Sequence, residues 1–479
     1  MILRVINHPY EFDMKNLCIT FFPHEKIRLE GEEDPVVVTT RRETDGSFFV
    51  SAKVYDVYRE TTAKPEPADE EHLVLSVALY RLLSGILGFA PPWGVLYGVR
   101  PAKLMHRLCA QMGDDAAVAH FQTAFLTQKS KAELAHEVML HENRSIARSG
   151  PKSFSLYVSI PFCPTRCAYC SFVSHSIEKT HKLMTPYVDL LLRELEETAK
   201  YAKELGLELA TVYFGGGTPT TLSAQDLGRI FSTIEQNFDL SHLMEYTVEA
   251  GRPDTVTWER LEVIQAAGVQ RISINPQSFN DKVLEAIGRR HTAQQTLDAF
   301  ALARDCGFDH INMDFIAGLP EDDLPSFQRS IQTALDLQAE SITVHTLALK
   351  TSAYMVTREQ TFDLKDRLTV SNMVDYAGQT LHGAGYYPYY MYRQSKSLGN
   401  LENVGWCKPG YDCLYNVYMM DETHTVLAVG AGAVTKLRGQ NSGMIERIYN
   451  YKYPYEYIRD FDTLLERKKR IPGFYAEYD

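Results

Sequence analysis

The chain has 479 residues, of which 45% are hydrophobic, and this length suits two or three domains with sizeable cores. The formal net charge is −12, so a general attraction to nucleic acid phosphates is not expected. The N-terminal run MILRVINHPYEFD lacks a sustained apolar stretch, and Arg81 and Ser84 interrupt the most apolar segment, residues 73–87. We therefore expect no signal peptide and no membrane span. Eight cysteines without an export signal indicate a reducing compartment, and we expect a cytoplasmic protein.

The first 65 residues contain four apolar runs that predict strands: ILRVI, CITFF, PVVVTT and SFFVSAKVYDVY. The last run alternates apolar and polar residues, as a half-buried strand does. After the polar stretch TTAKPEPADEEH, an amphipathic pattern predicts a helix over 71–87, which Pro91 and Pro92 end. A second helix is expected over 102–112. Residues 1–150 are therefore predicted to form an accessory α+β domain.

The pattern changes over residues 151–350, where six apolar runs alternate with amphipathic helical segments. The runs are SLYVSI, ATVYFGG, YTVEA, RISINP, HINMDFI and SITVHT, and the helical segments include 188–203, 227–237, 292–306 and 324–337. Repeated βα units predict a parallel sheet. Periodicity leaves open whether this sheet closes into a partial barrel or stays an open doubly wound sheet. In both cases ligands gather at the carboxyl ends of the strands.

Residues 351–479 are rich in tyrosine, in the runs YYPYYMYRQ, GYDCLYNVYMM and IYNYKYPYEY. We expect a mixed α/β extension that closes the open side of the sheet and the substrate pocket. Tyrosines line amphiphilic pockets well, but they are also common where two packed surfaces meet, and both interpretations stay open.

Three cysteines, Cys163, Cys167 and Cys170, follow the first of these predicted strands with the spacing C-x3-C-x2-C. This spacing fits a [4Fe–4S] cluster in which one iron lacks a cysteine ligand and can bind a small molecule. A zinc site with a remote fourth ligand, or three unconnected thiols, remain alternatives. Cys407 and Cys413 leave open a second metal site.

Polar and small residues recur at the ends of the following predicted strands. The turn Gly215–Pro219 would let the backbone approach a ligand closely. Glu249, Gln277 and Asp314 end later strands, and Arg289 follows shortly after Gln277. One acidic residue at a strand end is more often a helix cap or a salt-bridge partner. Recurrence on consecutive strands favours a shared binding site.

The run CPTRCAYC, with Tyr169 before the last cysteine, resembles the radical S-adenosylmethionine (SAM) superfamily, and YVSIPFC resembles its anaerobic coproporphyrinogen III oxidase family. The resemblance implies a partial (β/α)6 radical SAM barrel, and it implies that Cys163, Cys167 and Cys170 hold a catalytic [4Fe–4S] cluster. SAM would bind the remaining iron and yield a 5′-deoxyadenosyl radical on reduction. The positions that the resemblance assigns to SAM contact are Tyr157, Tyr169, Gly216, Gly217, Thr218, Glu249, Gln277, Arg289, Asp314, Ala348 and Val434.

Within this family, the long N-terminal part, IPFCPTRCAYCSF and the GNLENVGW…GAGA segment look most like the HemZ group. The oxidases themselves have a shorter N-terminal arm, and the haem chaperone group HemW carries H-N-x-x-Y-W where this chain has Glu402 in place of the histidine. The resemblance implies an oxidoreductase of the coproporphyrinogen dehydrogenase type in haem biosynthesis, which decarboxylates coproporphyrinogen III to protoporphyrinogen IX. A haem-binding chaperone or a radical SAM haem-modifying enzyme is the alternative.

The implied partners are a porphyrinogen substrate and a flavodoxin- or ferredoxin-like electron donor, with no nucleic acid and no membrane. Substrate propionates require basic residues near the radical. We consider Arg166 and Arg393 as candidates for this role, although both could be surface charges.

Overall fold

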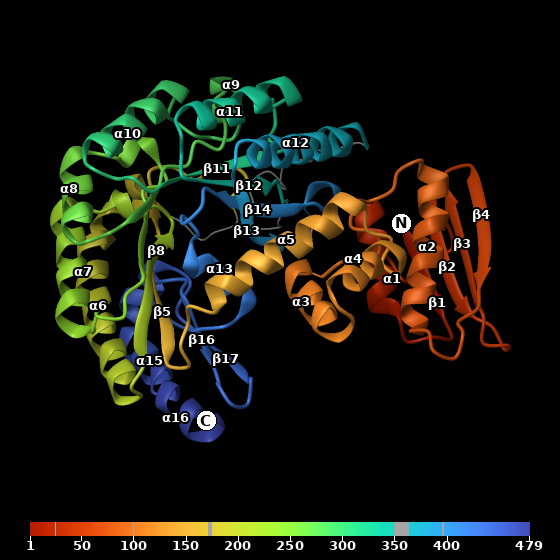
Figure 1. Ribbon diagram of the computed structural model, residues 1–479, viewed down its shortest axis with the longest axis horizontal. Coiled ribbons are helices and arrows are strands. Elements are labelled where there is room, and N and C mark those ends of the chain that lie inside the picture. Colours follow the sequence, from red (N-terminus) through yellow and green to blue (C-terminus); the bar gives the residue numbers. More distant parts are fainter. Residues whose placement is uncertain (24, 99, 171–174, 349–363, 395–396) are drawn as a thin grey trace.

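The computed structural model describes residues 1–23, 25–98, 100–170, 175–348, 364–394 and 397–479 (Figure 1). Two bodies are visible: a small sheet with flanking helices that holds the N-terminus, and a larger curved sheet ringed by helices. Within the described ranges, no helix has both the length and the apolar character needed to cross a bilayer.

The N-terminal body is a four-stranded sheet in the order β1-β2-β3-β4 with two helices packed on it. Its elements are β1 (Ile2–Ile6), α1 (Glu11–Phe21), β2 (Val36–Arg42), β3 (Phe48–Val54), β4 (Val57–Ala63) and α2 (Glu71–Leu87). Strands β1 and β2 run parallel, and the other pairs are antiparallel. Met14, Val50 and Leu79 belong to a hydrophobic core that this body has to itself.

Two predictions for this body were wrong. The run CITFF, predicted as a strand, belongs to α1, which buries Met14, Leu17, Cys18 and Phe21 at helical spacing. The run SFFVSAKVYDVY forms two antiparallel strands, not one, because the chain reverses at Tyr55, whose φ is 52°. The predicted helices over 71–87 and 102–112 are confirmed.

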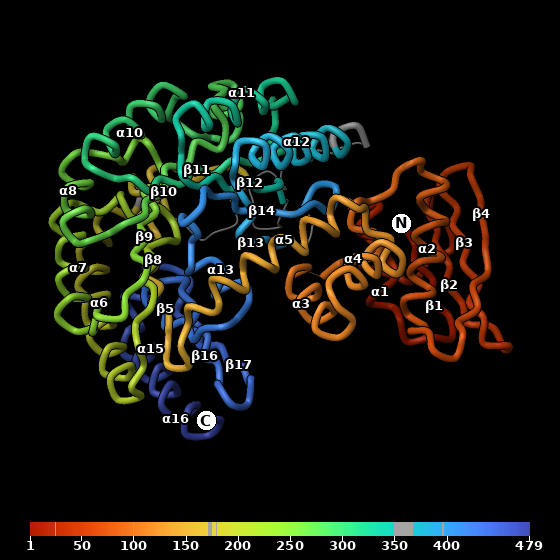
Figure 2. The backbone as a smooth tube through the Cα atoms, in the orientation of Figure 1, coloured from red at the N-terminus to blue at the C-terminus, as the bar shows by residue number. Residues whose placement is uncertain are grey.

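Three further helices lead from this body to the larger sheet: α3 (Pro101–Met112), α4 (Asp114–Thr123) and α5 (Lys129–Ile146). Their buried side chains, among them Met105, Phe121 and Val138, join the core of the large sheet and not that of the N-terminal body. Figure 2 shows α5 running from one body toward the other. A domain boundary at residue 150 stays a prediction.

The large sheet has eleven strands in the order β13-β14-β12-β11-β10-β9-β8-β5-β15-β16-β17. The six predicted strands lie side by side in it and are parallel: β5 (Ser153–Ile160), β8 (Glu208–Gly216), β9 (Glu245–Glu249), β10 (Arg271–Ser273), β11 (Ile311–Ala317) and β12 (Ser341–Thr346). They form the predicted partial (β/α)6 barrel.

Helices cover the outer face of this barrel (Figure 1): α6 (Ile177–Glu204), α7 (Ala224–Asn237), α8 (Trp258–Ala266), α9 (Asp281–Ala286), α10 (Ala293–Asp305) and α11 (Leu324–Asp336). Several begin at side-chain caps, such as Ser223 before α7 and the Thr292–Gln295 capping box of α10. Short pieces at the carboxyl ends of the strands are β6 (Phe162–Cys163), β7 (His175–Ser176), η1 (Pro219–Thr221) and η2 (Pro253–Thr255).

The C-terminal part adds strands to both edges of the barrel sheet. Antiparallel β13 (Tyr387–Arg393) and β14 (Glu402–Cys407) extend the β12 edge, while β15 (Thr425–Val429) pairs parallel with β5 and carries β16 (Val434–Arg438) and β17 (Ile445–Tyr449). The remaining elements are α12 (Leu364–Gly383), η4 (Leu398–Asn400), α13 (Leu414–Asp421), α14 (Pro454–Arg459), α15 (Phe461–Lys468) and α16 (Arg470–Tyr478). The predicted boundary between residues 350 and 351 lies outside the described residues.

Candidate active site

A cavity of about 530 Å³ opens among the carboxyl ends of the barrel strands. Residues from the first to the last barrel strand and from the C-terminal extension line it. The lining includes the three motif cysteines and every residue assigned to SAM contact: Cys163, Cys167, Cys170, Tyr157, Tyr169, Gly216, Gly217, Thr218, Glu249, Gln277, Arg289, Asp314, Ala348 and Val434. Residues spread over most of the chain therefore meet in one space.

The cysteine loop follows β5 and is tied to neighbouring turns by backbone hydrogen bonds. The Ala168 amide donates to the Ile287 carbonyl at 2.9 Å, and the Cys170 amide donates to the Cys167 carbonyl at 3.2 Å. The Thr218 hydroxyl lies 3.5 Å from the Cys163 Sγ. All eight cysteines are among the described residues, and none forms a disulfide. The loop thus presents three partly buried sulfur atoms to one cavity.

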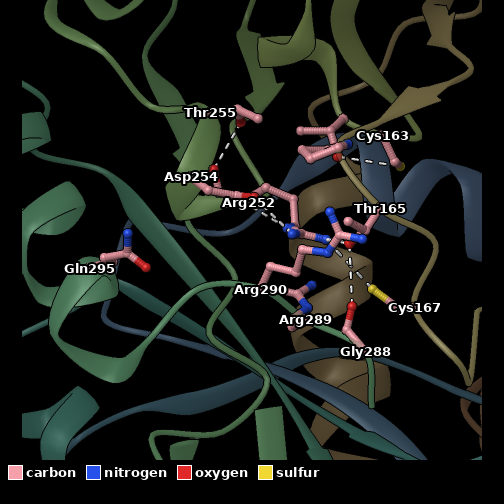
Figure 3. A network of polar contacts seen from close by, with 12 residues as sticks. Cys163, Thr165, Cys167, Arg252, Asp254, Thr255, Gly288, Arg289, Arg290 and Gln295 are labelled. Carbon is pink, nitrogen blue, oxygen red and sulfur yellow. Dashed lines mark hydrogen bonds and ion pairs between the residues drawn. The ribbon is translucent and has the colours of Figure 1, made fainter. Parts of the chain in front are cut away.

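Arg252 is a cavity residue that sequence reasoning missed (Figure 3). Its guanidinium pairs with Asp254 through two contacts of 2.9 Å, donates to the Thr165 hydroxyl at 3.0 Å and approaches the Cys167 Sγ at 3.9 Å. Arg252 therefore places a buried positive charge beside one of the three motif sulfur atoms. Its position three residues after Glu249, just beyond the end of the third barrel strand, could have indicated it as a site residue.

The glycine turn after β8 packs directly against the cysteine loop. The Gly217 amide donates to the Ile160 carbonyl and the Thr218 amide donates to the Phe162 carbonyl, both at 2.7 Å. A Cβ placed on Gly217 would lie 2.6 Å from the Phe162 carbonyl oxygen and 3.0 Å from the Cys163 Sγ. No side chain fits there, so the turn can approach the loop only as glycine.

Two carboxyl groups face the cavity in contrasting surroundings. The Tyr213 hydroxyl donates to Glu249 Oε1 at 2.6 Å, and burial, aided by nearby Asp314, raises the pKa of Glu249 to about 7. Burial would raise the pKa of Asp314 as well, but His345 at 3.8 Å and the 2.8 Å hydrogen bond from Asn312 hold it below its usual value. One carboxyl is therefore partly protonated near neutral pH while the other is ionised.

Gln277 and Arg289 present buried polar atoms to the cavity. Gln277 has a φ of 67° and its amide donates to the Asp314 carbonyl at 2.9 Å. Arg289 donates to the Asn275 carbonyl at 2.5 Å and lies 3.4 Å from the Tyr169 hydroxyl. Within the described part of the chain, Gln277 Oε1 and Arg289 Nε have no hydrogen-bond partner. Buried atoms of this kind are ready to bind a polar ligand.

Comparisons with known proteins identify the family of this chain. The Radical SAM superfamily profile matches residues 157–334. Over 470 residues the chain is 34% identical to the oxygen-independent coproporphyrinogen-III oxidase-like protein HemZ of Bacillus subtilis, an alignment that covers 95% of this chain and 94% of that protein. The chain belongs to the radical SAM superfamily.

Two further proteins resemble the chain over a smaller part of its length. The heme chaperone HemW of Haemophilus influenzae is 30% identical over 320 residues, which cover 66% of this chain and 78% of that protein. The radical SAM enzyme HemN, the coproporphyrinogen III oxidase of Escherichia coli, has the same fold, with a TM-score of 0.51 at 22% identity, covering 68% of this chain and 72% of that one.

Radical SAM proteins bind a [4Fe–4S] cluster and SAM, and the residues here fit both groups. Three sulfur atoms at one cavity wall suit the cluster. The unpartnered Gln277 Oε1 and Arg289 Nε, together with two carboxyl groups, suit a ligand that carries amine, carboxylate and ribose groups. Ala348, bridged to Ser397, and Val434, the first residue of β16, complete the lining.

Two residues considered for propionate binding do not reach this radical SAM cavity. Arg166 is exposed and, among the described residues, lies outside the lining. Arg393 is only 2% exposed, but it donates to the carbonyls of Leu96, Gly98 and Asn400 and stacks on Trp93. It therefore holds the N-terminal segment against β13.

Cys407 and Cys413 are buried in a tyrosine-rich cluster, where the Cys413 thiol donates to Glu245 at 3.4 Å. Neither belongs to a group of three metal-ligating side chains in the described ranges. Several of the predicted pocket tyrosines do line the cavity, among them Tyr390, Tyr392 and Tyr415.

Proposed function

We propose that this protein is an oxygen-independent oxidoreductase of haem biosynthesis, which converts coproporphyrinogen III to protoporphyrinogen IX. The observation that carries the proposal is the alignment along nearly the whole chain with a protein titled coproporphyrinogen-III oxidase-like. In this reaction each of two propionates loses one hydrogen atom from its β-carbon, CO2 and one electron, and becomes a vinyl group. The hydrogen atom goes to the radical, and an acceptor takes the electron.

The proposed roles of the residues follow from their places in the cavity. Cys163, Cys167 and Cys170 would hold the cluster, and a flavodoxin- or ferredoxin-like donor would reduce it. Bound there, the cluster and SAM supply a 5′-deoxyadenosyl radical. Arg252, which lies 3.9 Å from the Cys167 Sγ, would offset the negative charge of the bound cluster and its ligands.

The remaining polar residues would orient SAM. Arg289 offers a cation to its carboxylate, and the backbone at Gly216–Thr218 offers close contact to its amino group. Glu249 and Asp314 offer acceptors to the ribose hydroxyls. Tyr157, Tyr213 and Tyr415 stack on one another beside them and would exclude water from the radical.

A haem chaperone is the second candidate, since HemW proteins are relatives. The surroundings of Glu402 speak against it. Glu402 stands where the chaperone group has a histidine, is 1% exposed and accepts hydrogen bonds from Lys131 and from the Trp93 indole, each at 2.7 Å. A carboxylate held in this way is not available to a haem iron. A cytoplasmic location remains part of the proposal.

The test is anaerobic incubation of the reconstituted protein with SAM, dithionite, an electron acceptor and coproporphyrinogen III. Protoporphyrinogen IX and 5′-deoxyadenosine should form together. Cys167→Ala should lose the visible absorption of the cluster and both products, whereas the matched control Cys306→Ala, on the far side of the barrel wall at the end of α10, should keep them. Deoxyadenosine without protoporphyrinogen, or tight stoichiometric haem binding without turnover, would refute the proposed substrate.

A further inference from the structure

Arg271 lies at the deep end of the cavity and has no role in the assignments above. It is the first residue of β10, and Ser273 and Asn275 line the same cavity further along the chain. A strand rises about 3.3 Å per residue, so Arg271 lies roughly 7 Å below Ser273 along β10, away from the carboxyl end of the strand. A ligand that fills the cavity from the cluster downward ends at this guanidinium.

The Arg271 guanidinium is buried without the partners that such a group needs. It is 1% exposed, and in the described part of the chain its Nε and Nη1 have no hydrogen-bond partner and no carboxylate lies within 4.0 Å of it. The charges of Glu245, Glu249 and Asp314 act on this guanidinium from beyond ion-pair distance. Leaving a buried cation without a direct partner is costly, so Arg271 indicates an anion that binds from the cavity.

The other two arginines of the cavity lining make contacts of their own. Arg252 is paired with Asp254, and Arg289 is bonded to the Asn275 carbonyl. The nearby Glu245 carboxylate already accepts hydrogen bonds from the amides of Leu414 and Tyr415 and from a thiol. Within the described residues, Arg289 thus keeps one buried donor without a partner, Nε, which the proposed function gives to SAM, whereas Arg271 keeps two, Nε and Nη1.

We propose that Arg271 binds a carboxylate of the substrate, which under the proposed function is a propionate of the tetrapyrrole. A guanidinium can donate two parallel hydrogen bonds to a carboxylate, and it discriminates strongly against a neutral ester. The inference rests on the proposed function, but it concerns recognition and not the radical step. Arg271 is here a specificity-determining residue.

The experiment measures binding of coproporphyrin III, a stable oxidised probe, and of its tetramethyl ester to the reconstituted holoenzyme with SAM, by porphyrin fluorescence. Arg271→Gln should weaken binding of the acid roughly 10- to 100-fold and leave the ester and SAM affinities unchanged. Arg271→Lys keeps the charge but loses the paired donors, so it should fall between the two. Arg229→Gln removes a surface arginine that pairs with Asp189 and is the matched control.

Each outcome decides one claim. If Arg271→Gln binds acid and ester as the wild type does, Arg271 has a structural counter-charge role, with water or Glu245 as its partner, and the inference is overturned. If the wild type binds no coproporphyrin, the proposed substrate fails first and the inference with it. If Arg271→Gln does not fold, Arg271→Lys decides, because an unchanged preference for the acid in that variant contradicts paired recognition.

Discussion

Gly217→Ala should disrupt the cysteine loop without touching a sulfur ligand. The new Cβ would lie 2.6 Å from the Phe162 carbonyl oxygen, 2.9 Å from that of Ile160 and 3.0 Å from the Cys163 Sγ. Carbon–oxygen contacts in proteins normally lie at about 3.3 Å or more. The turn and the loop must therefore separate by roughly 0.7 Å.

The loss in free energy of unfolding follows from the hydrogen bonds that oppose this movement. Two hydrogen bonds of 2.7 Å, from the amides of Gly217 and Thr218, tie the turn to the strand before Cys163. Overpacking costs about 1–3 kcal/mol, and each weakened hydrogen bond adds about 1 kcal/mol. We expect a loss of roughly 3–5 kcal/mol. Because the entropy of unfolding is about 1 kcal/mol per kelvin for a chain of 479 residues, the melting temperature should fall by roughly 3–5 °C.

The assay compares Gly217→Ala with Gly228→Ala, a helical glycine of α7 whose added Cβ would meet only Val263 at 3.6 Å. The control should melt slightly higher, because alanine is a better helix former by about 1 kcal/mol. Iron content, cluster absorption and SAM affinity are measured on both after anaerobic reconstitution. Wild-type iron content and SAM affinity in Gly217→Ala would refute the packing argument.

The remaining predictions concern buried charges. Glu249 has its ordinary pKa near 4.5 in the unfolded chain and about 7 in the folded one, so its contribution to the free energy of unfolding is present below pH 4.5 and is lost as the pH rises through 7. Glu249→Gln should reduce the change in melting temperature of the apoprotein between pH 5 and 8. Parallel plots of melting temperature against pH for the variant and the wild type would contradict this. Lys131→Met leaves the Glu402 carboxylate buried without its cation at 2.7 Å and should cost about 3–5 kcal/mol in denaturant unfolding. The double variant with Glu402→Gln should recover part of that loss, and equal stability of single and double variants would count against the pairing.

The barrel could be predicted from the sequence because its signals are local. Each βα unit contains its own apolar run, its own amphipathic helix and its own polar residue at the strand end, so the six strands were found where they lie. The N-terminal run CITFF misled for the opposite reason. Its apolar residues are contiguous, and the helical spacing of Met14, Leu17 and Phe21 is visible only over a longer window.

Long-range contacts account for what was not predicted. Arg393 looked suitable for a propionate, but its carbonyl partners Leu96 and Gly98 lie far away in sequence and draw it out of the cavity. Arg271 was not predicted as a site residue because it begins a strand, whereas ligand-binding residues were expected at the carboxyl ends of strands. The sequence around Arg252 does not indicate its contact with Cys167. The two residues meet only in the folded barrel, where the segment after β9 packs against the cysteine loop.

The pairing of β5 with β15 has a consequence for the order in which the protein is made. The cysteine loop leaves the ribosome directly after β5, yet the outer edge of β5 gains its partner strand only after Thr425–Val429 has been made. The contacts that lock this edge, from Ser159 to the Ala431 carbonyl and from the Gly430 amide to Glu194, come equally late. A nascent chain therefore displays its cysteine loop beside a sheet edge that still lacks its neighbouring strand.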